Sequence, residues 1–293
     1  MRISSIDIGS NAIRQVIVET DQLGNYKVLK KHREMIRLGT DVFADGLIKP
    51  AMVNKLILAF KRMARLQKKF KVDRSLAYAT SAFRDARNKK PILAAIYKSS
   101  GVRIRVISGV KEAKLIRLAV QKTIGLTPER CLLIDIGGGS VELTELKNNK
   151  LGFSKSYKWG MVRMLEEAKA INTTTSLLLE SKIQEAKHLM PYGVFNLAIG
   201  TGGNIDAMAK LKLLVLKKGP NTFITFEELK QLYKEFITTD ASLRQSKFKI
   251  KADRADVLGP ALFLTLNLMK KYHIPKIKIP GVGLKEGAVL SLL

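Results

Sequence analysis

Short apolar runs alternate along the chain with small-residue turns. An opening apolar run ends in Asp7, and a small-residue turn at residues 9–11 leads into a second apolar run at residues 13–18. The same order recurs at residues 131–145, where an apolar run ends in Asp135 and three glycines precede the next run. Each unit predicts strand, tight turn and strand. Because the two units are about a domain's length apart, they predict two similar lobes.

Elsewhere the apolar residues recur at helical spacing or form short buried runs. Helices are expected at residues 50–70, 112–120, 173–190, 226–236 and 255–272, with a closing helix from Leu284. Short strands are expected at residues 75–79, 102–107, 194–199 and 276–279. Residues 38–47 are expected to form a loop, and residues 244–251 a basic connector. This order predicts an α/β protein with mixed sheets, divided into lobes at residues 1–123 and 124–293, with the closing helix packing back on the first lobe.

The glycine loop at residues 137–139 is the strongest candidate site. Glycine lets the backbone approach a ligand closely with its N–H groups facing oxygen. Asp135 and Glu142 bracket the loop, and carboxylates are the groups that hold a hard divalent cation. The loop therefore indicates a site for phosphate and metal. The alternative is a glycine hairpin flanked by two solvated acids.

Three further segments carry candidate chemistry. Thr80 and Ser81 end a strand and precede Arg84, which suits an oxyanion site; the alternative is an ordinary helix cap. Glu112 falls in the first turn of a helix. There it could orient a water molecule, or it could simply interact favourably with the helix dipole. Residues 200–203 form a third glycine turn at a strand end, a place suited to phosphate or nucleotide contact.

Composition adds one outlying feature, a formal net charge of +27 over 293 residues with pI ≈ 10.1. Such a surplus favours polyanionic partners, including nucleic acid, anionic membrane surfaces and polyphosphate, although a generally basic surface is the alternative. The single Cys131 excludes an intramolecular disulfide and a cysteine-based metal cluster. The sequence shows no signal peptide and no apolar run of about 18 residues, so we expect a cytoplasmic protein without membrane insertion.

Taken together, several segments resemble the exopolyphosphatase/guanosine pentaphosphate phosphohydrolase (Ppx/GppA) family of the actin/Hsp70/sugar-kinase superfamily. They follow the family's order over essentially the whole chain. The segments are residues 7–14 (DIGSNAIR), 79–88 (ATSAFRDARN), 107–113 (ISGVKEA), 134–142 (IDIGGGSVE), 200–203 (GTGG), 254–256 (RAD) and 283–287 (GLKEG).

The resemblance implies two ribonuclease-H-like lobes around a cleft in which a terminal phosphate is hydrolysed with Mg²⁺, or with Mn²⁺ in its place. It implies Asp135, Glu142 and Asp7 as metal ligands and Glu112 as general base, with Asp135 and Glu142 also counted as catalytic. The implied phosphate-binding residues are Ser10, Asn11, Arg14, Thr80, Ser81, Arg84, Gly137, Gly138, Gly139, Ser140, Gly200, Thr201, Gly202 and Gly203.

Two positions depart from the family pattern. Family members commonly carry paired acids where this chain has Lys111 and Glu112, and serine is frequent where it has Ala12. Longer relatives append a helical domain, so short polyphosphate or guanosine pentaphosphate is the expected substrate, with removal of its terminal phosphate as the expected reaction. A catalytically weak sensor of polyphosphate or guanosine tetra- or pentaphosphate is the main alternative, and an ATP-dependent kinase a third. Non-specific polyanion or nucleic-acid contact and a homodimer complete the expectations.

Overall fold

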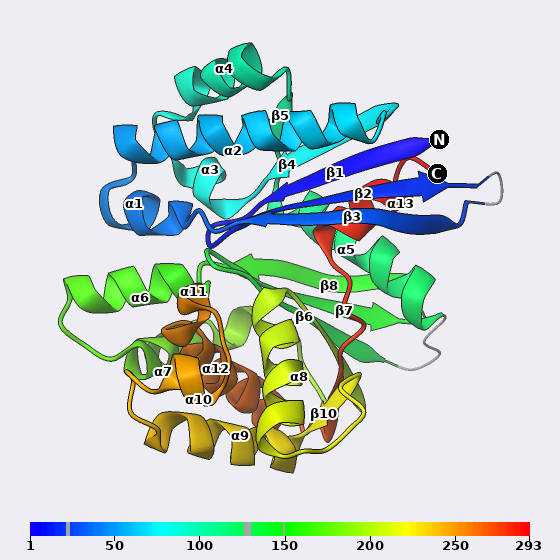
Figure 1. Cartoon of the computed structure of the whole chain (residues 1–293). Coiled ribbons are helices and arrows are strands. Elements are labelled where there is room, and N and C mark those ends of the chain that lie inside the picture. Colours follow the sequence, from blue (N-terminus) through cyan, green and yellow to red (C-terminus); the bar gives the residue numbers. More distant parts are fainter. Residues whose placement is uncertain (22–23, 126–129, 149) are drawn as a thin grey trace. The chain divides into compact units, whose positions relative to one another are not determined.

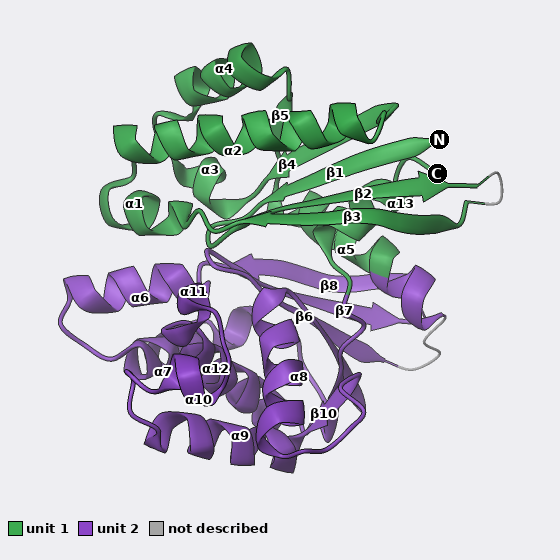
Figure 2. Ribbon diagram, viewed as in Figure 1, with its two compact units in different colours: residues 1–119, 282–293 green, residues 120–281 purple. Residues whose placement is uncertain are grey.

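A computed structural model of the chain describes residues 1–21, 24–125, 130–148 and 150–293. The chain divides into two compact units, which Figure 2 colours separately. Unit 1 comprises residues 1–119 and 282–293, and unit 2 comprises residues 120–281. The closing segment thus belongs to unit 1.

Unit 1 is built on a five-stranded mixed sheet with the strand order β3-β2-β1-β4-β5 (Figure 1). The first three strands are antiparallel, whereas β4 and β5 run parallel to β1. The strands are β1 (Arg2–Ile8), β2 (Ile13–Thr20), β3 (Tyr26–Glu34), β4 (Arg74–Ala79) and β5 (Ile104–Val106). The helices that begin in this unit are α1 (Leu38–Asp45), α2 (Pro50–Lys69), α3 (Ser81–Asp85), α4 (Lys89–Ser100), α5 (Gly109–Ile124) and α13 (Leu284–Leu290).

The two faces of β1 pack against different helices because its side chains alternate between them. Ile6 and Ile8 join the core cluster that contains Phe60 of α2. Ile3 belongs to a separate cluster with Val289 of α13. Asp7 has the same parity as Ile3, so it lies on the side of the sheet that α13 covers.

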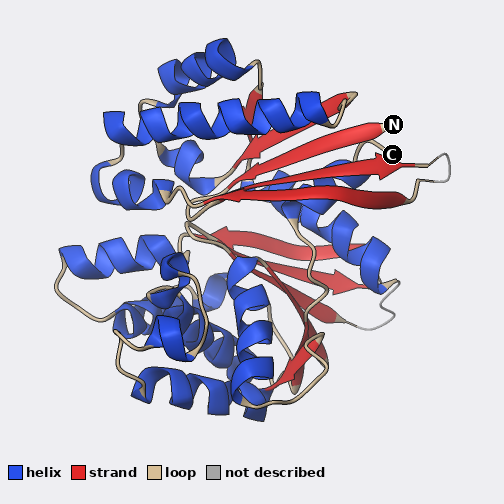
Figure 3. Ribbon diagram, in the orientation of Figure 1, coloured by secondary structure: helices blue, strands red, loops and turns tan. Residues whose placement is uncertain are grey.

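Unit 2 repeats this plan with a six-stranded sheet in the order β10-β11-β9-β6-β7-β8, and Figure 3 shows helices around both sheets. The strand β9 runs parallel to β6 and β11, whereas the other neighbours are antiparallel. The strands are β6 (Cys131–Ile136), β7 (Val141–Lys147), β8 (Lys150–Tyr157), β9 (Leu197–Thr201), β10 (Phe223–Thr225) and β11 (Lys276–Lys278). The helices are α6 (Met161–Ala170), α7 (Thr175–Glu185), η1 (Lys187–Leu189, 3-10), α8 (Gly203–Val215), α9 (Phe226–Thr238), α10 (Arg244–Lys247), α11 (Ala252–Ala255) and α12 (Leu258–Lys271). The expected pair of mixed α/β lobes is confirmed.

Three local predictions were wrong. Residues 38–47 contain the helix α1 because Leu38 and Val42, one turn apart, are both buried, and Gly46 ends the helix at a φ of 72°. The helix expected at residues 173–190 ends at Glu185 and continues as a 3-10 turn. The basic connector at residues 244–251 contains the short helix α10. For α1 packing thus outweighs the local residue preferences, whereas the 3-10 turn and α10 bury none of their residues.

Within the described ranges, no helix has the combination of length and apolar character that crossing a bilayer requires.

Candidate active-site residues

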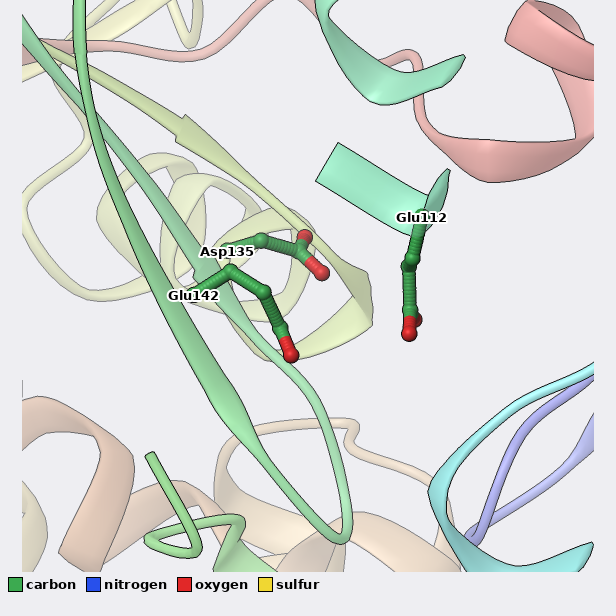
Figure 4. Close-up of side chains that lie close together, drawn as sticks. All are labelled: Glu112, Asp135 and Glu142. Carbon is green, nitrogen blue, oxygen red and sulfur yellow. The ribbon is translucent and has the colours of Figure 1, made fainter. Parts of the chain in front are cut away.

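Asp135 and Glu142 face each other across the hairpin formed by β6 and β7. Residues opposite each other in an antiparallel pair project from the same face of the sheet, and Figure 4 shows both carboxylates pointing to the same side. Each is buried, and each offers an oxygen within 4.8 Å of the other. The hairpin therefore converts a sequence spacing of seven residues into a pair of adjacent carboxylates.

Neighbouring strands hold both carboxylates by hydrogen bonds. The hydroxyl of Thr201 on β9 donates to Asp135 Oδ1 at 2.6 Å. The hydroxyl of Ser156 on β8 donates to Glu142 Oε1 at 2.7 Å. Gly202 follows Thr201 with a φ of 91°, and a Cβ there would lie 2.9 Å from Asp135 Oδ1. These contacts fix the orientation of the acids from outside the hairpin.

The glycine loop is held by the beginning of α6. The carbonyl of Gly137 accepts the N–H of Met161, and the carbonyl of Gly138 accepts the N–H groups of Val162 and Arg163, at 2.8–3.1 Å. The guanidinium of Arg163 donates to the carbonyl of Gly139 at 2.8 Å. In each of these peptide units the N–H group points away from the carbonyl. Because the carbonyls face α6, the N–H groups face the other side of the loop, where another partner can bind.

The amides of Gly138, Gly139 and Ser140 have no backbone acceptor in the part of the chain that the structure describes. Successive N–H groups of this kind form a concave anion site. Gly160, which precedes α6, approaches this loop so closely that a Cβ would lie 2.2 Å from the backbone of Gly139 and Ser140. The loop is thus supported by close backbone packing as well as by hydrogen bonds.

The third glycine segment contributes mainly to packing around Asp135. Gly200 lies inside β9, where a Cβ would meet Ile277 at 2.7 Å, and Thr201 and Gly202 contact Asp135 as described above. Gly203 begins α8. The next residue, Asn204, donates to the carbonyl of Ile136 at 3.2 Å.

In unit 1, the hairpin of β1 and β2 places two charged residues opposite each other, as the hairpin of β6 and β7 does, but an arginine takes the place of the second acid. Asp7 is opposite Arg14, and their side chains form an ion pair of 3.4 Å. Burial raises the pKa of Asp7, the positive charges of Arg14 and Lys285 oppose that shift, and the charge of Glu286 adds to it. Asp7 therefore lies among charged side chains of β2 and α13.

The hydroxyl and arginine residues of unit 1 gather near the ends of β1 and β4. Ser10 Oγ lies 2.9 Å from Ser81 Oγ. Asn11 Oδ1 accepts from Arg37 Nε at 2.7 Å. Thr80 occupies the N-cap position of α3, but its side chain makes no capping hydrogen bond. Its hydroxyl instead faces the carbonyl of Ile8 at 3.5 Å.

Arg84 and Glu112 meet at the end of unit 1 where β5 leads into α5. Arg84 Nη1 donates to the carbonyl of Ile107 at 2.8 Å and lies 3.5 Å from Glu112 Oε2. Glu112 is buried, whereas the neighbouring Lys111 is exposed. The structure therefore brings Arg84 together with Glu112.

Some residues of this arrangement carry no clear signal in the sequence. Arg163 and Ser156 lie in segments without a motif, and only the fold brings them to the glycine loop and to Glu142. Arg254 lies in the segment Arg254–Asp256 of the family resemblance, but without an expected role. Its guanidinium donates to Asn204 Oδ1, which in turn links it to β6.

The donor set of unit 2 fits a hard divalent cation. Asp135 and Glu142 supply neighbouring carboxylate oxygens, the ligands that Mg²⁺ prefers. Among the residues that the structure describes, no histidine or cysteine lies with them in a group that could hold a metal ion. The hydroxyls of Thr201 and Ser156, which donate to the two acids, would hold these carboxylates in place around such an ion.

The sequence model of the Ppx/GppA phosphatase family matches residues 16–293. Among curated proteins, exopolyphosphatase 1 of Mycobacterium leprae is 26% identical over 100% of this chain and 90% of its own length. Exopolyphosphatase 1 of Mycobacterium tuberculosis strain H37Rv is 25% identical over 100% of this chain and 88% of its own length.

Solved structures agree with this match. A crystal structure of the Aquifex aeolicus member of the Ppx/GppA family has a TM-score of 0.80 at 25% identity, covering 100% of this chain and 97% of that one. An exopolyphosphatase from Cytophaga hutchinsonii has a TM-score of 0.88 at 21% identity, with the same coverage, and this likeness concerns the fold alone. The family resemblance inferred from the motifs is confirmed.

Proposed function

Because the chain belongs to the Ppx/GppA phosphatase family, we propose that it is a Mg²⁺-dependent phosphohydrolase that removes the terminal phosphate of inorganic polyphosphate. The observation that carries this proposal is the buried pair of Asp135 and Glu142 beside a loop whose amides have no backbone acceptor among the described residues. Two curated relatives named exopolyphosphatase 1 support the choice of polyphosphate. Guanosine pentaphosphate is the second proposed substrate.

The amides of Gly138, Gly139 and Ser140 would receive phosphate oxygens, and Asp135 and Glu142 would hold Mg²⁺. When bound, the ion neutralises phosphate charge. Ser10, Asn11, Arg14 and Arg84 of unit 1, together with the hydroxyls of Thr80 and Ser81, are proposed to grip further phosphate oxygens. The segment 200–203 is proposed to contribute through its backbone, and Asp7 stays a proposed metal ligand. Phosphoryl transfer mainly needs such positioning and charge neutralisation.

Glu112 is proposed as the general base. A water molecule would attack the terminal phosphorus and lose its proton to the Glu112 carboxylate. The bond between that phosphorus and the bridging oxygen would break, and the shortened chain would leave with the electron pair on this oxygen. Arg84, 3.5 Å from Glu112, would orient the carboxylate and add positive charge near the transferred group.

Phosphate release from polyphosphate by Glu112→Gln tests this proposal. We expect the variant to lose at least about 10²-fold in rate, the lower end of the range for loss of a general base, while its equilibrium affinity for polyphosphate stays within about twofold. Glu227→Gln is a matched control because Glu227 is an exposed acid in the first turn of another helix. Undiminished turnover by Glu112→Gln would show that Glu112 is not the base.

A sensor of polyphosphate or guanosine phosphates is the second candidate, favoured by Lys111 in place of a paired acid. It predicts binding of these ligands without phosphate release stimulated by Mg²⁺. Rates measured side by side on short polyphosphate, long polyphosphate and guanosine pentaphosphate would separate the candidates and define the preferred substrate. A cytoplasmic location and a homodimer also stay predictions.

A further inference from the structure

A basic groove lies on unit 1 between α2 and the end of α4. Its volume is ≈ 630 Å³, and its lining includes four cations but no carboxylate: Lys61, Arg65, Lys68 and Lys98. The other lining residues are small: Ala64, Ser99, Ser100 and Gly101. All four cations are exposed. The groove thus combines a concave surface with a single sign of charge, an arrangement that concentrates anions.

The cations follow one side of α2. Lys61, Arg65 and Lys68 are spaced by four and three residues, so they project from the same side of the helix over about 10 Å at 1.5 Å per residue. In the described part of the chain, none of the four groove cations forms an ion pair with a carboxylate. By contrast, the intervening Arg62 is paired with Glu34 at 2.7 Å. The groove side of α2 therefore keeps its positive charge available.

The strand β5 extends this charge away from the groove. It follows α4 directly and forms one edge of the sheet (Figure 1). Arg103 immediately precedes β5 and Arg105 lies within it, on either side of Ile104, and both arginines are exposed. Arg103 lies 5.4 Å from the centre of the Tyr97 ring, in the last turns of α4. This contact places the first arginine next to the end of α4 that lines the groove.

The far end of β5 leads to Glu112. From Arg103 to Ser108 an extended chain covers about 17 Å at 3.3 Å per residue, and the N–H of Glu112 donates to the carbonyl of Ser108 at 3.0 Å. We call the six residues Lys61, Arg65, Lys68, Lys98, Arg103 and Arg105 the basic track. The basic track begins at the groove and ends near the start of α5, whose first turn carries the proposed base.

We propose that the basic track binds the distal part of a long inorganic polyphosphate chain whose terminal phosphate is at the proposed catalytic residues. The inference rests on the proposed function for the catalytic end only. Polyphosphate suits the track because each of its units is negatively charged and it has no bases that the protein would have to recognise. The groove lining contains no aromatic side chain on which nucleic-acid bases could stack. The Tyr97 ring beside the groove is 49% exposed, and the Arg103 guanidinium lies over one of its faces.

Equilibrium binding to polyphosphate in the Glu112→Gln background tests the track without turnover. The track variant is Lys61→Gln, Arg65→Gln and Lys98→Gln. The matched control is Lys27→Gln, Lys30→Gln and Lys31→Gln, which removes the same charge from exposed positions of β3 at the opposite edge of the same sheet. Circular dichroism and thermal midpoints of both variants establish that they fold.

We expect the track variant to bind long polyphosphate about tenfold or more weakly at 0.1 M salt, with a shallower dependence of log K on log salt, because fewer counterions are released. The control should stay within about twofold. With Glu112 intact, the track variant should raise KM for long chains and leave kcat, and KM for tripolyphosphate, unchanged. An additional Arg103→Gln and Arg105→Gln pair should weaken long-chain binding further.

Equal loss of binding in track and control variants would overturn the proposal, because net charge alone would then explain it. Loss of single-stranded RNA binding with unchanged polyphosphate binding would overturn it as well and make the track a nucleic-acid surface. If the intact protein releases no phosphate from any substrate but binds polyphosphate through the track, the hydrolase assignment fails and the track stands.

Discussion

The hydroxyl of Thr201 donates a hydrogen bond of 2.6 Å to Asp135 Oδ1 from the parallel neighbouring strand. Both groups are buried, with Thr201 1% and Asp135 8% exposed. A carboxylate that is to hold a metal must be kept in one orientation, and an outer-shell donor of this kind fixes it. Thr201 was expected to bind phosphate, whereas its hydroxyl contacts the proposed metal ligand.

Thr201→Val should therefore weaken the response to Mg²⁺. The substitution keeps the shape of the side chain and removes its donor, so we expect the Mg²⁺ concentration for half-maximal phosphate release to rise about 10-fold or more. Thr201→Ser, which restores the hydroxyl, should regain most of the response. A Mg²⁺ titration of the rate at saturating substrate measures both variants, and an unchanged midpoint for Thr201→Val would contradict the role.

Gly160→Ala should disrupt the glycine loop. The added Cβ would lie 2.2 Å from backbone atoms of Gly139 and Ser140, and backbone cannot move aside as a flexible side chain can. We expect a loss of stability of about 2 kcal/mol or more together with loss of phosphate release. Thermal unfolding and activity assays measure the two effects. Gly219→Ala is the control, since a Cβ there meets nothing within 4 Å and should be tolerated.

The hairpin pairs were predictable from the sequence, whereas the support around them was not. Once strand, tight turn and strand are recognised, the short turn determines which residues face each other, and Asp135 must then be close to Glu142. Arg163 reaches Gly139 from 24 residues further along the chain. Contacts of that kind depend on how α6 packs, which no local pattern determines. The helix at residues 38–45 was missed for the same reason, because burial of Leu38 and Val42 defines it.

Lys111→Gln should have little effect on catalysis, although Lys111 adjoins the proposed base. Successive residues of a helix point about 100° apart, and here Glu112 is buried beside Arg84 while Lys111 is exposed. We expect the rate to change by no more than about threefold and the shape of its pH profile to stay the same, because a well-solvated charge has only a small electrostatic effect on its neighbours. Steady-state kinetics between pH 6 and 9 provide the measurement. A shift of the acidic limb of the profile, or a large gain in rate, would show instead that the Lys111 charge weakens the base.

The ion pair between Arg62 and Glu34 should give unit 1 a pH-dependent contribution to stability. Arg62 contacts both oxygens of Glu34, at 2.7 and 2.8 Å. The hydrogen bond from Arg62, followed by the one from His32, lowers the pKa of Glu34. An acid with a lowered folded-state pKa stabilises the protein above its unfolded pKa of about 4.3, and this contribution is lost as pH falls through the folded value.

Arg62→Gln should therefore reduce the thermal midpoint at pH 7, and the difference from the unmodified protein should shrink as the pH falls below about 4. Arg62 is 48% exposed and Glu34 14% exposed, so solvent screening limits the effect to about 1 kcal/mol. Thermal unfolding at pH 7, 5, 4 and 3 measures the difference. Lys55→Gln on the same helix, which removes an exposed cation without an ion pair in the described residues, should show no such pH dependence. A constant difference for Arg62→Gln across the whole pH range would show that the loss comes from packing of the Arg62 stem instead of from the charge pair.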